Sequence, residues 1–122
     1  MKLFIGIIFL GMSFNALSIP QTPKLLSCNI EEQRALPGEI GGHITDTGEA
    51  HISKRANILT SDVIRFRKVR MLTKTQAKDL IHRIEKIRFQ TDEHVRGQNF
   101  LSVAEKASLD QELDSIALQL CR

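Results

Sequence analysis

Two helix-start signals in the last fifty residues constrain the fold more than any other feature of the chain. Thr73 is followed three residues later by Gln76, and Ser102 is followed three residues later by Glu105. This spacing is typical of a capping box, in which the hydroxyl accepts a free backbone N–H and the second side chain reaches back. We therefore expect one helix to begin after each of these two hydroxyl residues.

Apolar side chains recur at helical intervals behind both signals. They are Ala77, Leu80, Ile81, Ile84, Ile87 and Val95 in the first segment, and Ala107, Leu109, Leu113, Ile116, Ala117 and Leu120 in the second. Each stripe lies on one side of its helix and needs a partner to bury it. The pattern predicts helices over residues 73–96 and 103–121, with Gly97 as the stop of the first, packed as an antiparallel helical hairpin.

The N-terminal segment has the pattern of an export signal. Residues 1–18 combine one basic residue, Lys2, with the apolar run Leu3–Leu10, and end on the small residues of an A-x-S cleavage site. This pattern is typical of a secretory signal peptide rather than of a membrane span. We expect a single mature domain, residues 19–122, located in the periplasm or secreted.

The chain has two cysteines, Cys28 and Cys121. In an exported protein such a pair is usually bridged. Because the bridge would close a loop of nearly the whole mature chain, it would add about 4–5 kcal/mol to the free energy of unfolding. Two unpaired thiols are one alternative. Lipidation of Cys28 is another, because residues 25–28 resemble a lipobox, although the polar residues 20–24 separate it from the apolar run and Cys121 would lose its partner.

The middle of the chain is less regular. Residues 19–36 are expected to form an extended leader and a short helix, with Asn29 as its cap and Pro37 as its stop. Residues 37–52 are rich in glycine and predict either a loop or a small β-hairpin around a turn at residues 46–49. The overall prediction is therefore a small, mainly α domain that contains one disulfide and at most a short β-hairpin.

The segment 53–72 is ambiguous from sequence. Leu59, Val63 and Phe66 have helical spacing, and Thr60 or Ser61 would then serve as the cap. The apolar–basic alternation around Phe66 is instead typical of a strand. We favour the helix, and the strand remains the alternative.

The same segment carries the strongest surface signal, a set of basic residues opposed locally only by Asp62. The candidate contact residues are Lys54, Arg55, Arg65, Arg67, Lys68 and Arg70. Arginine predominates, which favours bidentate contacts with carboxylate or phosphate. The simpler interpretation is a solvated helix face balanced by acids of the last helix (Glu105, Asp110, Glu112 and Asp114).

Total charge argues against a nucleic-acid partner. The chain has 17 basic and 14 acidic residues, and loss of Lys2 with residues 1–18 leaves 16 basic residues and a formal charge of +2. The chain has no Trp or Tyr, on which sugar rings usually stack. We expect neither a nucleic-acid nor a carbohydrate site.

Motifs for chemistry are weak. Asp46–Gly48 matches the aspartic-protease tripeptide, but it occurs once in a mainly helical chain and suits a turn. His43 and His51 face each other in the hairpin alternative, and His82 lies three residues from Glu85, yet neither pair has further ligands at a recognisable spacing. We expect no metal, no cofactor and no enzymatic activity.

These features together favour a binding protein. A signal peptide, 104 remaining residues, one disulfide and no active-site motif are typical of small exported proteins such as periplasmic immunity proteins and enzyme inhibitors. We expect a stoichiometric protein partner, contacted by residues 54–70 and by the Gly-rich residues 37–50. The alternatives are an envelope-associated protein that binds an anionic polymer or lipid surface and, as a third choice, a small hydrolase.

Overall fold

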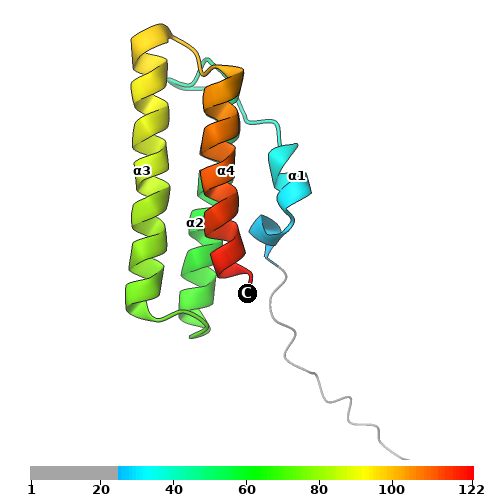
Figure 1. Cartoon of the computed structure of the whole chain (residues 1–122), viewed down its shortest axis with the longest axis vertical. Coiled ribbons are helices and arrows are strands. Elements are labelled where there is room, and N and C mark those ends of the chain that lie inside the picture. Colours follow the sequence, from blue (N-terminus) through cyan, green and yellow to red (C-terminus); the bar gives the residue numbers. More distant parts are fainter. Residues whose placement is uncertain (1–24) are drawn as a thin grey trace, which may run out of the picture.

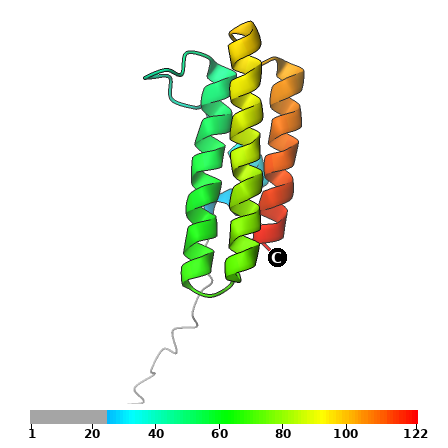
Figure 2. The ribbon, with the colours of Figure 1, turned by 90° about the vertical axis from the view of Figure 1, so that its left-hand side faces the viewer.

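Three long helices make up most of the structure, a computed structural model that describes residues 25–122. In chain order the elements are η1 (Leu26–Cys28, a 3-10 turn), α1 (Ile30–Arg34), α2 (Thr47–Lys68), α3 (Lys74–Gln98) and α4 (Val103–Leu120). The three long helices lie side by side, each antiparallel to the one before it, and α1 lies beside α4 (Figure 1, Figure 2). The prediction of a mainly α domain is confirmed, whereas the expected signal peptide lies outside the described residues.

A side-chain cap starts each of the four α-helices within residues 25–122. Thr73 and Ser102 form the two predicted capping boxes, and each hydroxyl accepts a backbone N–H at 3.1 Å. Asn29 caps α1 as predicted. The cap of α2 is Asp46, whose carboxylate accepts the backbone N–H of Glu49 at 2.9 Å. These caps satisfy N–H groups that have no partner inside their own helix.

The β-hairpin that was one alternative for residues 37–52 is not found in the described chain. Gly41 and Ile44 exchange two backbone hydrogen bonds of 3.1 and 3.0 Å, but this bridge is isolated. Residues 47–52 instead form the first turns of α2. The helix is the more stable structure here because it places Ile52, which is 1% exposed, in the core of the bundle. A lone two-stranded hairpin has little stability of its own.

The helical interpretation of residues 53–72 is correct as far as Lys68, and the strand alternative is wrong. Thr60 and Ser61 lie in the middle of α2 and are not caps; the Thr60 hydroxyl donates to the carbonyl of Ala56 at 2.8 Å. The side chains that α2 buries recur at helical intervals: Ile52, Ala56, Leu59, Val63 and Phe66. They face both α3 and α4.

The core is one cluster that all three long helices share. Beside the α2 residues it contains Ala77, Leu80, Ile84 and Ile87 of α3, and Leu109, Leu113, Ile116, Ala117 and Leu120 of α4. Ile84, Ile87, Leu113 and Ile116 are completely buried. The two C-terminal stripes, apart from Ala107, which is exposed, therefore find their partner in each other and in α2.

The predicted disulfide between Cys28 and Cys121 is present, with a Cα–Cα distance of 5.7 Å. The alternatives of free thiols and of a lipidated Cys28 are therefore wrong for this structure. A second tie lies next to it: Asp62 is buried and accepts hydrogen bonds from the backbone N–H and the hydroxyl of Ser27, at 3.0 and 2.5 Å. Together they hold the segment before α1 against the bundle.

Residues with left-handed backbone end α2 and α3. Gly97 was predicted to end its helix, but α3 continues through it to Gln98 and ends at Asn99, which has a φ of 69°. Asparagine tolerates this conformation better than most residues. At the end of α2 the left-handed residue is Arg70, with a φ of 60°.

Candidate functional site

Four of the six predicted contact residues lie together at the C-terminal end of α2 and in the turn that follows it. We call Arg65, Arg67, Lys68 and Arg70 the basic end. All four side chains are exposed, and among residues 25–122 none of them forms an ion pair. Asp62, the one acid near them in sequence, points inward to Ser27. The outward charge of this segment is therefore entirely positive.

Apolar side chains are exposed among these cations. Ile64 is 44% exposed, Val69 is 54% exposed and Met71 is 46% exposed. Mixed surfaces of arginine, methionine and aliphatic side chains are typical of the central part of protein interfaces. The basic end therefore combines exposed positive charge with exposed apolar surface.

Arg55 is a correction to the predicted patch, because it is buried and only 3% exposed. Its guanidinium donates to Asp110 and to Asp114 of α4, at 2.8 Å in each case. Lys54 is only partly exposed, and its ammonium is 4.0 Å from Glu39. The rise of the helix separates Lys54 from the basic end by roughly 16 Å, so the six residues do not form one patch.

The buried arginine is part of a polar junction that we call the α2–α4 network. Asp110 accepts hydrogen bonds from Arg55 at 2.8 Å and from the half-exposed Lys106 at 3.1 Å, and it contacts His51 at 2.7 Å. Asp114 joins Arg55 to Arg34 of α1. The network therefore fixes α1, α2 and α4 relative to one another. Asp110 and Asp114, two of the four acids that the simpler interpretation sets against the basic end, are committed to this network.

The charges of the network act strongly on the carboxyl group of Asp110. Burial by itself raises the pKa of this group, because it disfavours the ionised form. Hydrogen bonds from His51 and Arg55, with a further contribution from Lys106, outweigh that effect and hold the pKa well below its ordinary value. Asp110 is therefore ionised throughout the physiological pH range.

His51 and Asp110 resemble the base and orienting acid of a catalytic set, but their geometry is structural. One ring nitrogen of His51 faces Asp110, and the other lies 2.6 Å from the backbone carbonyl of Leu36. The side chain is 4% exposed. The predicted opposition of His43 and His51 across a hairpin is wrong, since His51 lies within α2 and His43 in the preceding loop.

The aspartic-protease tripeptide is the start of α2. Besides capping the helix, Asp46 accepts the backbone N–H of Leu101, from the connection between α3 and α4, at 3.2 Å. A side chain at Gly48 would meet Leu101 at 3.2 Å. The tripeptide therefore joins one end of α2 to the neighbouring loop, and its carboxylate is committed to two backbone groups.

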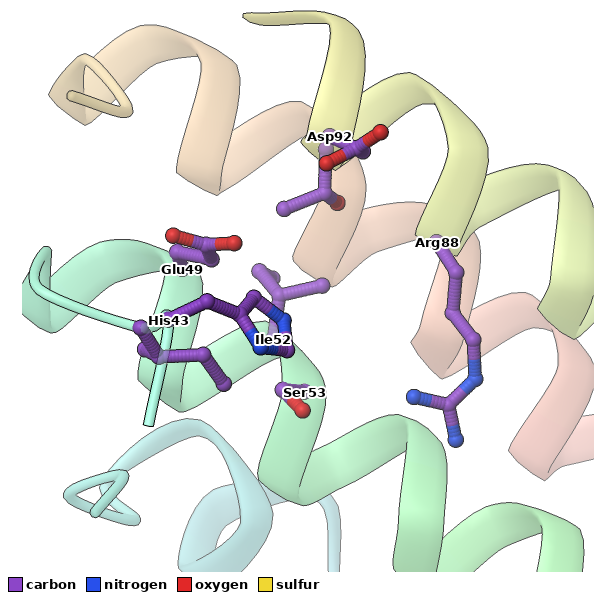
Figure 3. A pocket seen from close by; sticks show the side chains of 8 residues that line it. His43, Glu49, Ile52, Ser53, Arg88 and Asp92 are labelled. Carbon is purple, nitrogen blue, oxygen red and sulfur yellow. The ribbon is translucent and has the colours of Figure 1, made fainter. Parts of the chain in front are cut away.

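A pocket of about 220 Å³ lies between α2 and α3, next to the loop before α2 (Figure 3). Its lining residues are His43, Ile44, Glu49, Ile52, Ser53, Arg88, Thr91 and Asp92. Glu49 is 9% exposed, and its Oε2 has no hydrogen-bond partner within the described part of the chain. Burial raises the pKa of Glu49; the negative charges of Asp46 and Asp92 add to that effect, and His43 opposes it.

Sequence reasoning missed Glu49 as a functional candidate. The sequence predicts a turn at residues 46–49, where an acidic side chain such as that of Glu49 is usually solvated. Its burial follows from the approach of the Gly-rich loop and α3, which no local pattern encodes. The same loop, predicted as a second contact surface, lies at the opposite end of α2 from the basic end (Figure 2).

No known protein family matches the chain, and no curated protein or solved structure matches it either. Within residues 25–122, no helix combines the length and apolar character that crossing a membrane requires. The disulfide is compatible with an extracellular or periplasmic location.

Proposed function

We propose that this chain is an exported small binding protein that acts stoichiometrically on a protein partner, as inhibitors and immunity proteins do. The observation that carries the proposal is the basic end, where four exposed cations that form no ion pair within residues 25–122 lie in one segment with three exposed apolar side chains. Cations that have no internal partner gain most from an acidic surface brought against them. The exposed apolar side chains add contact area that a small anion would not cover.

The proposed partner presents an acidic patch with apolar residues at its centre. Arginine supplies three of the four cations of the basic end, and its planar fork fits carboxylates in two-point contacts. Steering by these charges speeds association at low salt, whereas the apolar contacts slow dissociation. Binding to the partner should therefore weaken with salt without disappearing.

Charge reversal at the basic end is the direct test. The variant Arg65→Glu/Arg67→Glu/Arg70→Glu is expected to lose affinity for the partner by about a hundredfold or more, because attraction becomes repulsion. The measurement is affinity capture from the source organism's envelope extract with the disulfide-bonded protein and with the variant, followed by titration of the captured protein. The helical signal in circular dichroism should persist in the variant.

A matched control reverses basic side chains elsewhere on the surface. Lys78→Glu/Lys86→Glu on α3 changes exposed lysines outside the basic end and should leave capture unchanged. Capture of the same protein with equal affinity by the charge-reversed variant would overturn the proposal. Binding to anionic vesicles, with no protein partner at one-to-one stoichiometry, would favour the envelope-associated alternative.

Arg70 offers a second test, which separates binding from stability. Its left-handed position belongs to a Schellman motif: the N–H of Met71 bonds to the carbonyl of Phe66 at 2.9 Å, and the N–H of Arg70 bonds to that of Arg67 at 3.1 Å. Glycine is the residue that fits this position without strain. Arg70→Gly is therefore expected to increase the free energy of unfolding by about 1 kcal/mol and to weaken partner binding.

Urea denaturation measures the first effect of Arg70→Gly, and titration of the partner measures the second. The control is Asn99→Gly, which relieves the other left-handed residue and should stabilise the fold slightly without touching binding. A variant of Arg70 that is more stable and binds equally well would remove this side chain from the contact surface.

A further inference from the structure

We propose that the pocket between α2 and α3 binds a free α-amino acid, a small zwitterion with one ammonium and one carboxylate group. Two opposite charges on its walls carry this inference, Glu49 from α2 and Arg88 from α3. Figure 3 places them on different sides of the pocket. The site is separate from the basic end, which lies at the other end of α2, so the two proposals stand or fall independently.

The buried carboxylate of Glu49 needs a hydrogen-bond donor. Its Oε2 has no partner within the described residues, and only 9% of the residue is exposed. A buried acceptor without a donor is costly, and native proteins rarely leave one. An ammonium group in the pocket would supply both the missing donor and the missing positive charge.

The charges around Glu49 favour a cation at this end of the pocket. Asp92 lies on α3 at the edge of the pocket. The negative charges of Asp92 and Asp46 both raise the pKa of Glu49. Each of these two acids is already bonded, Asp92 to Arg96 and Asp46 to backbone N–H groups. No cluster of three metal-ligating side chains occurs among residues 25–122, so an organic ammonium fits better than a metal ion.

Arg88 supplies the complementary charge for a carboxylate. One of its nitrogens donates to Asn57 at 2.6 Å, and another lies 3.4 Å from Glu85. A guanidinium has five N–H donors, so several remain for a ligand. Arg88 precedes Asp92 by one helical turn, a rise of about 6 Å along α3, and Ser53 follows Glu49 by the same step along α2. The acid and the guanidinium therefore come from facing helices, and a small ligand that carries both an ammonium and a carboxylate group can meet one charge on each wall.

The remaining wall defines the ligand's side chain. Ile44 and Ile52 give the pocket an apolar surface, while the Thr91 hydroxyl is already bonded to its own helix. A volume of about 220 Å³ is suited to a small ligand rather than to a cofactor. The expected ligands are amino acids with small or aliphatic side chains.

The test uses the disulfide-bonded protein from the full chain and measures thermal unfolding and isothermal titration with L-alanine, L-serine and L-valine. At least one should raise the unfolding midpoint in a concentration-dependent way. Isobutylamine and 3-methylbutanoic acid, which keep the valine side chain and α-carbon but lack one charged group, should bind at least about tenfold more weakly. No binding by any of the three amino acids, or equal binding of isobutylamine and L-valine, would overturn the proposal.

Two wall variants sharpen this test. Glu49→Gln and Arg88→Gln should each weaken amino-acid binding by about tenfold or more, because each removes one charged contact. The controls Glu93→Gln and Lys86→Gln change exposed residues of α3 that do not line the pocket and should bind as the parent does. Unchanged affinity in Glu49→Gln would remove the carboxylate from the site.

The stability of Glu49→Gln gives an independent readout that also shows that the variant folds. The pKa of Glu49 is raised above its ordinary value of 4.5 in the folded state. The ionised carboxylate therefore lowers the stability of the fold as the pH rises above that value, and it has no such effect below it. The variant should therefore unfold at a higher temperature than the parent at pH 7, and this difference should vanish near pH 4. A lower midpoint at pH 7 would show that the carboxylate has an internal partner and would contradict the proposal.

Discussion

Loss of the disulfide is expected to lower the free energy of unfolding by about 4 kcal/mol. Cys28 and Cys121 are 93 residues apart, so their bond closes a loop that contains nearly every described residue. In the chain-entropy model a loop of this size removes more freedom from the unfolded chain than any shorter bridge would. Small domains have total stabilities of about 5–15 kcal/mol, so this one bond decides whether the fold is robust or marginal.

The measurement is urea denaturation of the oxidised protein and of Cys28→Ala/Cys121→Ala. Because the Ser27–Asp62 contacts do not need the bridge, native circular dichroism of the variant should persist in the absence of urea. Reducing agent provides the control: it should destabilise the parent by the same amount and leave the double variant unchanged. A difference below about 1 kcal/mol between the two proteins would contradict the prediction.

Most of the helical architecture could be predicted because its determinants are local. The capping boxes at Thr73 and Ser102 and the apolar stripes behind them are encoded within a few turns, and the structure contains both helices. A signal of the same kind precedes α2. Asp46 followed three residues later by Glu49 has the spacing of a helix start, whereas the glycines around this segment favour a turn between strands.

The burial of Arg55 can also be predicted from the sequence if its segment is taken as a helix. Ile52, Arg55, Leu59, Asp62 and Phe66 are three or four residues apart and therefore lie on one stripe of α2. Both charged members of that stripe are buried in the structure. As long as strand and helix are both possible, the buried side of this segment is undetermined, and a basic residue is more often exposed than buried.

The pocket had no comparable signal. Its walls come from three places in the chain, and the burial of Glu49 depends on how closely the preceding loop approaches α2. Gly38 marks that approach: a Cβ there would lie 1.9 Å from the backbone of Ala50, so only glycine fits. Contacts between distant segments of this kind are set by packing, which single-sequence patterns do not encode.

Asp110→Ala is expected to lower the free energy of unfolding by about as much as loss of the disulfide does. Asp110→Ala takes the shared acceptor away from His51 and Arg55, both of which stay buried. Breaking a buried ionic pair from one side typically costs about 3–5 kcal/mol, because the remaining charge has lost both water and partner. The matched control is Glu112→Ala, which removes an exposed acid two residues away on α4 and should cost well under about 1 kcal/mol.

The pH dependence identifies the carboxylate as the cause. Because the folded pKa of Asp110 lies below its ordinary value of 3.8, its contribution is complete above that value and is lost as the pH falls further. The stability difference between the parent and Asp110→Ala should therefore be constant from pH 7 to about pH 5 and should shrink below about pH 4. Urea denaturation of both proteins at each pH measures it. A difference that does not shrink in acid would mean that the packing of Asp110, rather than its charge, holds α1, α2 and α4 together.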